Sequence, residues 1–269
     1  MNTEYTSKLL LSCINEISHK NIYKLTVDAF ENLLTHKKTS SIVFQTAHAY
    51  SFLAFIQEDD STLKNRKIKA VKNYKKAISF FKIYLRINKD IFLPPTKPLI
   101  NNKEIIFNHK KLIEISKVNE EIARDYISLL EIAACLTEIA EIENNIDKYK
   151  EAIEKYREAL SLNYIFPEVF LKIGNCYFKM AEISHNTTYL KTSIGFYSKI
   201  KDEVFLEEKE SLICRSLFML GKLKRDVKIL ANTLKRIELG SKTDTYLTGV
   251  MCTIELEAIL NNENTSFVD

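Results

Sequence analysis

The sequence predicts an all-α protein, and three observations carry that prediction. Only 5 Gly and 4 Pro occur among 269 residues, so the chain has little of the turn chemistry that a β-rich fold needs. No segment alternates apolar and polar residues over a sustained length, as a half-buried strand does. Apolar residues recur instead at intervals of three and four positions, the period of a helix face. We therefore expect antiparallel helix hairpins, about ten to twelve helices in all.

Helical periodicity divides the chain into segments that are separated by caps and turns. Ser or Asp residues precede some of these segments, as expected of helix N-caps. The expected helices span residues 3–19, 22–36, 40–56, 63–88, 103–117, 120–142, 149–162, 167–183, 184–200, 206–222, 224–237 and 244–261.

One segment interrupts this pattern firmly. Residues 92–103 hold three of the four prolines, and a residue that precedes proline is pushed out of the helical region. The segment is either a loop insertion or a hinge. We expect helical hairpins over 1–91 before it and a helical array over 104–262 after it, closed by a capping helix; 263–269 is then a loose tail.

The best-patterned stretch is 149–183. Ala152, Tyr156 and Ala159 lie at i, i+4 and i+7 on one helix stripe, and Pro167 suits the first turn of the next helix. Gly174 follows within that second helix. Small residues that face bulky ones let two helices approach closely, so we expect these two helices to interlock. The same spacing recurs near residues 77–84 and 193–200.

This order of small, bulky and aromatic positions resembles a tetratricopeptide repeat, a helix hairpin of about 34 residues. The resemblance implies an α-solenoid that binds a protein or peptide partner in the groove lined by the first helix of each hairpin. It implies a non-catalytic scaffold or adaptor, of the co-chaperone or regulatory type, without a cofactor.

The resemblance also implies which residues face the groove. The positions that match are Glu168, Leu171, Asn175, Phe178, Ser211, Arg215 and Phe218, and Lys172 and Lys179 lie beside them. Asn and Arg at such places are similar to the carboxylate clamp of chaperone-binding repeats, although Leu171 stands where that clamp has lysine. The resemblance therefore favours a mixed polar and aromatic groove for an extended or helical peptide. Replacing Asn175 and Arg215 is expected to weaken binding without changing stability.

Charge is distributed unevenly along the chain. Residues 62–117 contain 15 Lys and Arg and three acids, whereas residues 118–168 contain 12 Asp and Glu and five Lys and Arg. The basic strip is expected at Lys64, Arg66, Lys67, Lys69, Lys72, Lys75 and Lys76. This strip predicts a solvated surface or one that complements the acidic part of another copy. The alternative function is nucleic-acid binding, in which the release of counterions favours binding.

Motifs for catalysis or metal binding are absent from the sequence. The five cysteines contain no CxxC pair and are expected to be small core residues. Cys176 and His185 are nine positions apart, but we expect Cys176 in the core and His185 in a loop. The five histidines form no HxxH or HxxxH pair, and no Gly-rich phosphate loop occurs. We expect no enzyme, metal site or cofactor. A third alternative is an enzyme or toxin-like effector on a helical scaffold, but the sequence contains no recognisable set of catalytic residues for it.

The first twenty residues have no basic segment followed by a long apolar one, and no run of about 18 apolar residues occurs anywhere. We therefore expect a soluble, intracellular protein, cytoplasmic and without a membrane segment. The oligomeric state does not follow from the sequence.

Overall fold

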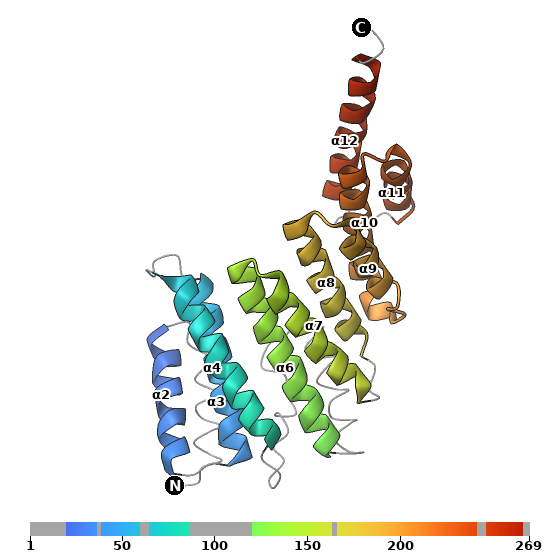
Figure 1. Ribbon diagram of the computed structural model, residues 1–269. Coiled ribbons are helices and arrows are strands. Elements are labelled where there is room, and N and C mark those ends of the chain that lie inside the picture. The colour runs from blue at the N-terminus through green and yellow to red at the C-terminus, as the bar shows by residue number, and fades with distance from the viewer. Residues whose placement is uncertain are drawn as a thin grey trace. The chain divides into compact units, whose positions relative to one another are not determined.

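The computed structural model describes residues 20–36, 39–59, 65–86, 120–162, 166–240 and 246–265. Within these ranges the chain consists of ten α-helices, one short 3-10 helix and their connections, and it contains no strand (Figure 1). The predicted all-α fold is confirmed. The helices expected at 3–19 and 103–117, and the break at 92–103, lie outside the described residues.

The described α-helices have 11 to 24 residues each. Their bounds are α2 (Lys20–His36), α3 (Ser40–Asp59), α4 (Arg66–Arg86), α6 (Glu120–Glu143), α7 (Ile146–Ser161), α8 (Pro167–Ser184), α9 (Thr187–Tyr197), the 3-10 helix η1 (Glu203–Phe205), α10 (Leu206–Lys224), α11 (Val227–Gly240) and α12 (Tyr246–Thr265). The last helix continues four residues past the expected end at 261, into the predicted tail.

The chain forms two compact units, Met1–Tyr164 and Ile165–Asp269. In the first unit α2 packs on α3, α3 on α4, α4 on α6 and α6 on α7. In the second unit α8 packs on α9, α9 on α10, α10 on α11 and α11 on α12. Helices therefore pair as consecutive hairpins, and we call α3, α6, α8 and α10 first helices and α4, α7, α9 and α11 second helices.

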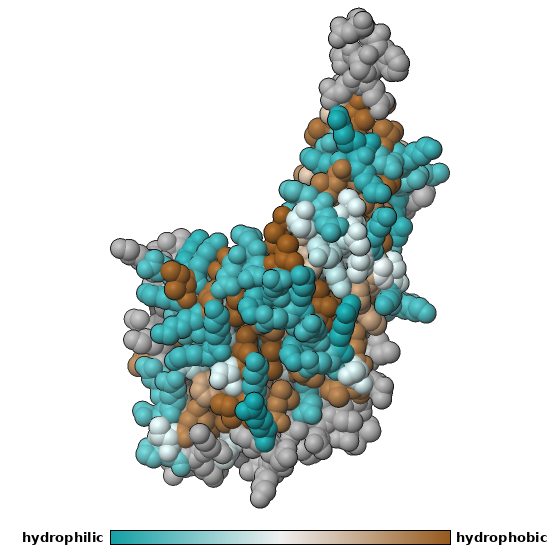
Figure 2. Space-filling model, viewed as in Figure 1, coloured by the Kyte–Doolittle hydropathy of each residue, from teal (hydrophilic) through white to brown (hydrophobic). Residues whose placement is uncertain are grey.

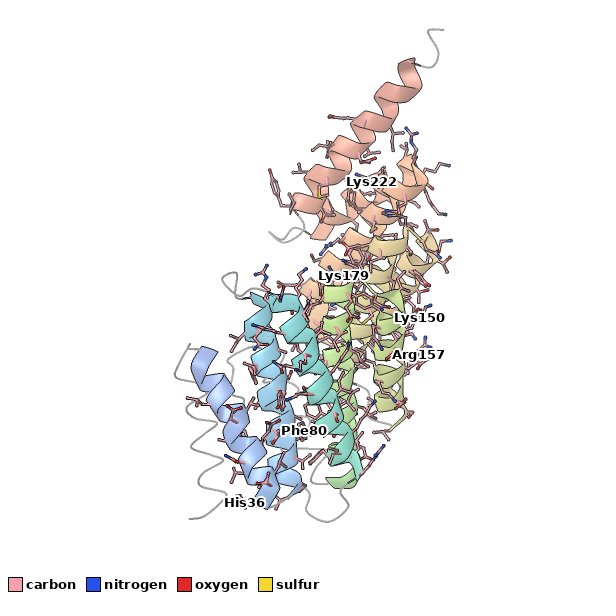
Figure 3. All side chains as sticks on the ribbon, turned by 60° about the vertical axis from the view of Figure 1, so that its left-hand side comes forward. His36, Phe80, Lys150, Arg157, Lys179 and Lys222 are labelled. Carbon is pink, nitrogen blue, oxygen red and sulfur yellow. The ribbon has the colours of Figure 1, made fainter. Side chains whose placement is uncertain are left out.

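Aromatic contacts hold the α3–α4 hairpin of the first unit together. The ring of Phe44 lies 4.9 Å from that of Tyr84, and Tyr50 stacks on Phe80 at 5.7 Å between centroids. Figure 3 labels Phe80 on α4. Early residues of α3 meet late residues of α4, so the two helices run antiparallel. Each such aromatic pair contributes about 0.5–1.5 kcal/mol beyond the area that it buries.

The turn between α6 and α7 is built from two asparagines. Asn144 adopts a left-handed conformation with φ 47°, which Asn tolerates better than most residues. Asn145 caps α7, because its side chain accepts hydrogen bonds from the backbone N–H groups of Asp147 and Lys148. Such a cap contributes about 1 kcal/mol. The next stripe of α7, Ala152, Tyr156 and Ala159, is buried as predicted.

Gly174 allows the close approach of α8 and α9. A Cβ at this position would lie 2.7 Å from Cδ1 of Tyr197 and closer still to Cε1, so any side chain would overlap the ring. The spacing of small and bulky residues predicts that Gly174 meets the helix at 149–162. The ring that occupies its face comes instead from α9, the second helix of its own hairpin, which a turn at His185 and Asn186 brings back along α8.

The second unit repeats itself at an interval of 40 residues. Leu190 of α9 and Leu230 of α11 are both fully buried, and so are Ser193 and Thr233, three positions further along each helix. Ion pairs follow the same register: Glu182 of α8 pairs with Arg215 of α10 at 3.3 Å, and Lys222 of α10 pairs with Glu255 of α12 at 3.1 Å. The array is therefore regular, with a repeat longer than 34 residues.

The contact between Gly174 and Tyr197 can be tested with a matched pair of glycines. Gly174→Ala should lower the free energy of unfolding by about 1–3 kcal/mol, since the buried Tyr197 ring must move to admit a methyl group. Gly195→Ala is the control, because no atom lies within 4 Å of its Cβ position. This control should raise stability by up to about 1 kcal/mol through helix propensity. Denaturant unfolding measures both; equal effects would contradict the close approach.

Candidate partner-binding surface

A polar stripe runs along α8 beside the face on which Gly174 meets Tyr197. Lys172, Asn175, Lys179 and Glu182 are spaced by three or four residues, so they share one helix face, and all four are partly exposed. Lys179 is labelled on α8 in Figure 3. Arg215 of the neighbouring α10 joins this face through its ion pair with Glu182. We call Lys172, Asn175, Lys179, Glu182 and Arg215 the α8–α10 surface.

Arg215 is held in place by two different contacts. Its guanidinium lies 4.8 Å from the centre of the Phe178 ring and 3.3 Å from Oε1 of Glu182. Lys179 reaches the other carboxylate oxygen of Glu182 at 3.2 Å. One carboxylate thus lies between two cations, and the surface keeps a positive excess. Exposed ion pairs of this kind contribute about 0–1 kcal/mol, so an incoming carboxylate can compete for Arg215 at little cost.

Four of the predicted groove residues are buried instead. Glu168, Leu171, Phe178 and Phe218 are each less than a tenth exposed, so they do not offer their side chains to a partner. Phe178 supports the surface from beneath, as the ring under Arg215. The remaining prediction, Ser211 on α10, is partly exposed.

Phe218 has a structural role in the second unit. It packs with Leu230 of α11 and with Cys252 and Ile259 of α12. The sequence places Phe178 and Phe218 40 residues apart in equivalent first helices, and both face the inside of the array. Because both phenylalanines lie beside polar residues in the sequence, they were predicted to line the groove. Tertiary packing buries both side chains instead.

Asn175 supports the fold as well as the surface. Its side-chain oxygen accepts a hydrogen bond from the Tyr197 hydroxyl at 2.6 Å. Tyr197 is fully buried, and that burial raises the pKa of its hydroxyl, which stays a neutral donor. From the sequence, Asn175 was predicted to contact a partner only. No sequence signal pairs it with Tyr197, because the two residues lie 22 positions apart on different helices.

The predicted basic strip divides between solvent and ion pairs. Lys67, Lys69 and Lys72 are exposed on α4, whereas Lys75 lies 3.7 Å from Glu143 of α6. Lys76 donates to the Tyr50 hydroxyl at 2.7 Å and lies above the Tyr50 ring. Lys64 lies outside the described residues, and Arg66 is partly exposed at the start of α4.

The aromatic residues near this strip do not join it. Tyr74, Phe81 and Tyr84 are buried on the opposite face of α4, and Phe80 stacks on Tyr50. The helix therefore offers a lysine-rich face without rings on which bases could stack.

Among the described residues, side chains that could bind a metal ion do not cluster. No three His, Cys, Asp or Glu side chains among them come close enough to hold a metal ion. Cys176 is buried and His185 is exposed at the C-terminal end of α8, as predicted. Burial raises the pKa of the Cys252 thiol to about 11, which disfavours the reactive thiolate. Among the helices described, none is both long and apolar enough to cross a membrane.

Comparison with known proteins adds no family to this description. No protein-family model matches the sequence, and no curated protein matches it significantly.

The double role of Asn175 leads to a stability prediction. Asn175→Ala removes the acceptor of a buried tyrosine hydroxyl and should lower the free energy of unfolding by about 1 kcal/mol. In a Tyr197→Phe background the same substitution should cost clearly less, since no hydroxyl is left without its partner. Urea unfolding of the four proteins gives the coupling energy. A coupling of zero would show that the hydrogen bond does not stabilise the fold.

Proposed function

We propose that this protein is a non-catalytic scaffold of tetratricopeptide-like hairpins that binds a protein or peptide partner through the α8–α10 surface. One observation carries the proposal: Arg215 is fixed over the Phe178 ring beside Lys179, with one carboxylate between the two cations. Rigid helices thereby present cationic donors in a defined position. Such an arrangement recognises a group on another molecule better than mobile surface lysines do.

The partner that fits this surface is acidic. A peptide carboxylate, from an Asp or Glu side chain or from a free C-terminus, can replace Glu182 as the acceptor of the Arg215 guanidinium. Charge-assisted hydrogen bonds between guanidinium and carboxylate are among the stronger polar contacts in proteins. Asn175 and Lys172, about one and two turns before Lys179 on α8, supply further polar groups. These features support an acidic peptide, extended or helical, as the ligand.

A display library of random peptides with free C-termini tests this function. Selection on the full chain should enrich peptides with Asp, Glu or a terminal carboxylate. The variant Lys179→Glu/Arg215→Glu should weaken the enriched peptides at least about tenfold, since two attractive contacts become repulsive. Fluorescence anisotropy with synthetic peptides measures the change.

The matched control is Lys191→Glu/Lys235→Glu, which makes the same change of charge on the second helices α9 and α11. Both lysines are exposed. The control should bind as the native chain does. If both variants lose binding equally, net charge rather than this surface governs recognition, and the proposal fails; the same holds if no peptide is enriched.

A second candidate function rests on α4. Lys72, Lys75, Lys82 and Arg86 follow one another at three to seven positions along its exposed face. A row of cations suits the phosphate backbone of nucleic acid, and the buried aromatics favour a mode that does not depend on sequence. Lys75 already pairs with Glu143, which weakens the candidate.

Salt dependence separates this function from peptide binding. If α4 binds nucleic acid, affinity for a random duplex should fall at least about tenfold between roughly 50 and 200 mM salt, through counterion release. Lys72→Glu/Lys82→Glu should reduce binding and flatten the salt slope, whereas Lys191→Glu/Lys235→Glu should do so less. Anisotropy of a labelled duplex provides the measurement. Absence of binding at low salt excludes this function.

A further inference from the structure

The last helix exposes an apolar stripe. Leu247 and Ile254 are 68% and 60% exposed, and Val250 and Met251 between them are also exposed. These residues lie at i, i+3, i+4 and i+7, so they form one continuous face of α12. Figure 2 shows hydrophobic surface on this helix, which Figure 1 labels at the C-terminal end of the chain. We call Leu247, Val250, Met251 and Ile254 the α12 stripe.

The opposite face of α12 packs against α10 and α11. Cys252 and Ile259 are buried and pack with Phe218 of α10 and Leu230 of α11. The helix is thus apolar on both sides, a pattern that belongs to helices buried on both sides. The sequence predicts a capping helix at this place, and α12 does cover the preceding hairpin. The outer face of a solenoid cap is usually polar, whereas the outer face of α12 is apolar.

The 40-residue repeat indicates which position in a hairpin α12 occupies. The ion pair of Lys222 with Glu255 repeats, 40 residues later, the ion pair of Glu182 with Arg215. Glu255 of α12 therefore takes the place that Arg215 takes in α10. In this register α12 takes the position of a first helix.

The same register identifies the role of the stripe. Val250 and Ile254 correspond to Glu210 and Cys214 of α10, and to Phe170 and Gly174 of α8. In α8 this face meets the second helix: Phe170 lies against Phe196, and Gly174 lies under Tyr197. In α10, Glu210 binds Arg236 of α11. The α12 stripe is therefore the surface on which the earlier first helices hold their second helices.

We propose that the α12 stripe binds an amphipathic helix of a partner protein, which takes the place of the second helix. This site is separate from the α8–α10 surface and does not depend on the proposed function. The second helices α9 and α11 indicate which sequence pattern the partner helix needs. It has a large side chain at position i, a small one at i+3 and a large one at i+7. In α9 these residues are Leu190, Ser193 and Tyr197, and in α11 they are Leu230, Thr233 and Ile237.

Charge specifies the partner further. Residues 246–260 of α12 contain two acids, Glu255 and Glu257, and no Lys, Arg or His, and Glu257 is exposed. A helix with basic residues beside its apolar face complements this surface. A second copy that presented its own α12 would bring two acidic helices together, which like-charge repulsion disfavours. The occupant is therefore a basic amphipathic helix rather than another copy of this chain.

The chain itself supplies a probe for the experiment. A synthetic peptide with the sequence of α11, VKILANTLKRIELG, has the required pattern and carries Lys228, Lys235 and Arg236. Fluorescein-labelled and blocked at both ends, it should bind the full chain saturably. A peptide with those three basic residues changed to Glu should bind at least about tenfold more weakly.

Two variants locate the binding. Ile254→Glu and, independently, Leu247→Glu should each weaken the α11 peptide about tenfold or more, since both place a charge in the contact. The matched control is Leu25→Glu on α2, another exposed leucine, at 65% exposure. It should leave binding unchanged. All three side chains are exposed, so the melting temperatures should stay close to that of the native chain, which circular dichroism checks.

Three results would overturn the proposal. The first is absence of peptide binding, and the second is binding that neither α12 variant weakens, which would place the peptide elsewhere, for example on α10. The third is a dimer of the native chain in sedimentation velocity that Ile254→Glu dissociates, since a second copy would then cover the stripe. A native monomer that binds the basic peptide, with loss in both α12 variants and not in Leu25→Glu, supports it.

Discussion

The close approach of the two helices in each hairpin is the constraint on which the second unit depends. Gly174 has no side chain because the ring of Tyr197 fills the space where one would lie. That ring is anchored at its far end, where its hydroxyl donates to Asn175. One small residue and one hydrogen bond thus set the distance and the rotation of α8 against α9. The rotation in turn decides which residues of α8 are left facing solvent.

Regular stacking carries this local geometry along the array. Equivalent positions 40 residues apart are buried alike, as at Leu190 and Leu230, and ion pairs join successive first helices in the same register. A stack of this kind buries each helix between neighbours, so its ends differ from its middle. The two surfaces proposed to bind partners arise from this: one is the polar outer side of first helices, and the other is the exposed apolar face of the last described helix.

The helical periodicity of the sequence identified most helices and the buried stripe of Ala152, Tyr156 and Ala159, since spacing alone determines which residues share a face. It also predicted that Cys176 would be buried. The groove was predicted less well. Phe178 and Phe218 lie beside polar residues in the sequence, but a rotation of a few tens of degrees separates a buried position from an exposed one, and periodicity does not resolve that angle.

The sequence by itself determined the class of fold, the uneven distribution of charge and the small and bulky positions that make hairpins. These follow from composition and from contacts between residues close in the chain. Only the tertiary structure decided that Gly174 lies under Tyr197, that Arg215 lies over Phe178 and that α12 exposes an apolar face. Each of these depends on which helices pack together, and residues 20 to 40 positions apart carry no local signal of their contact.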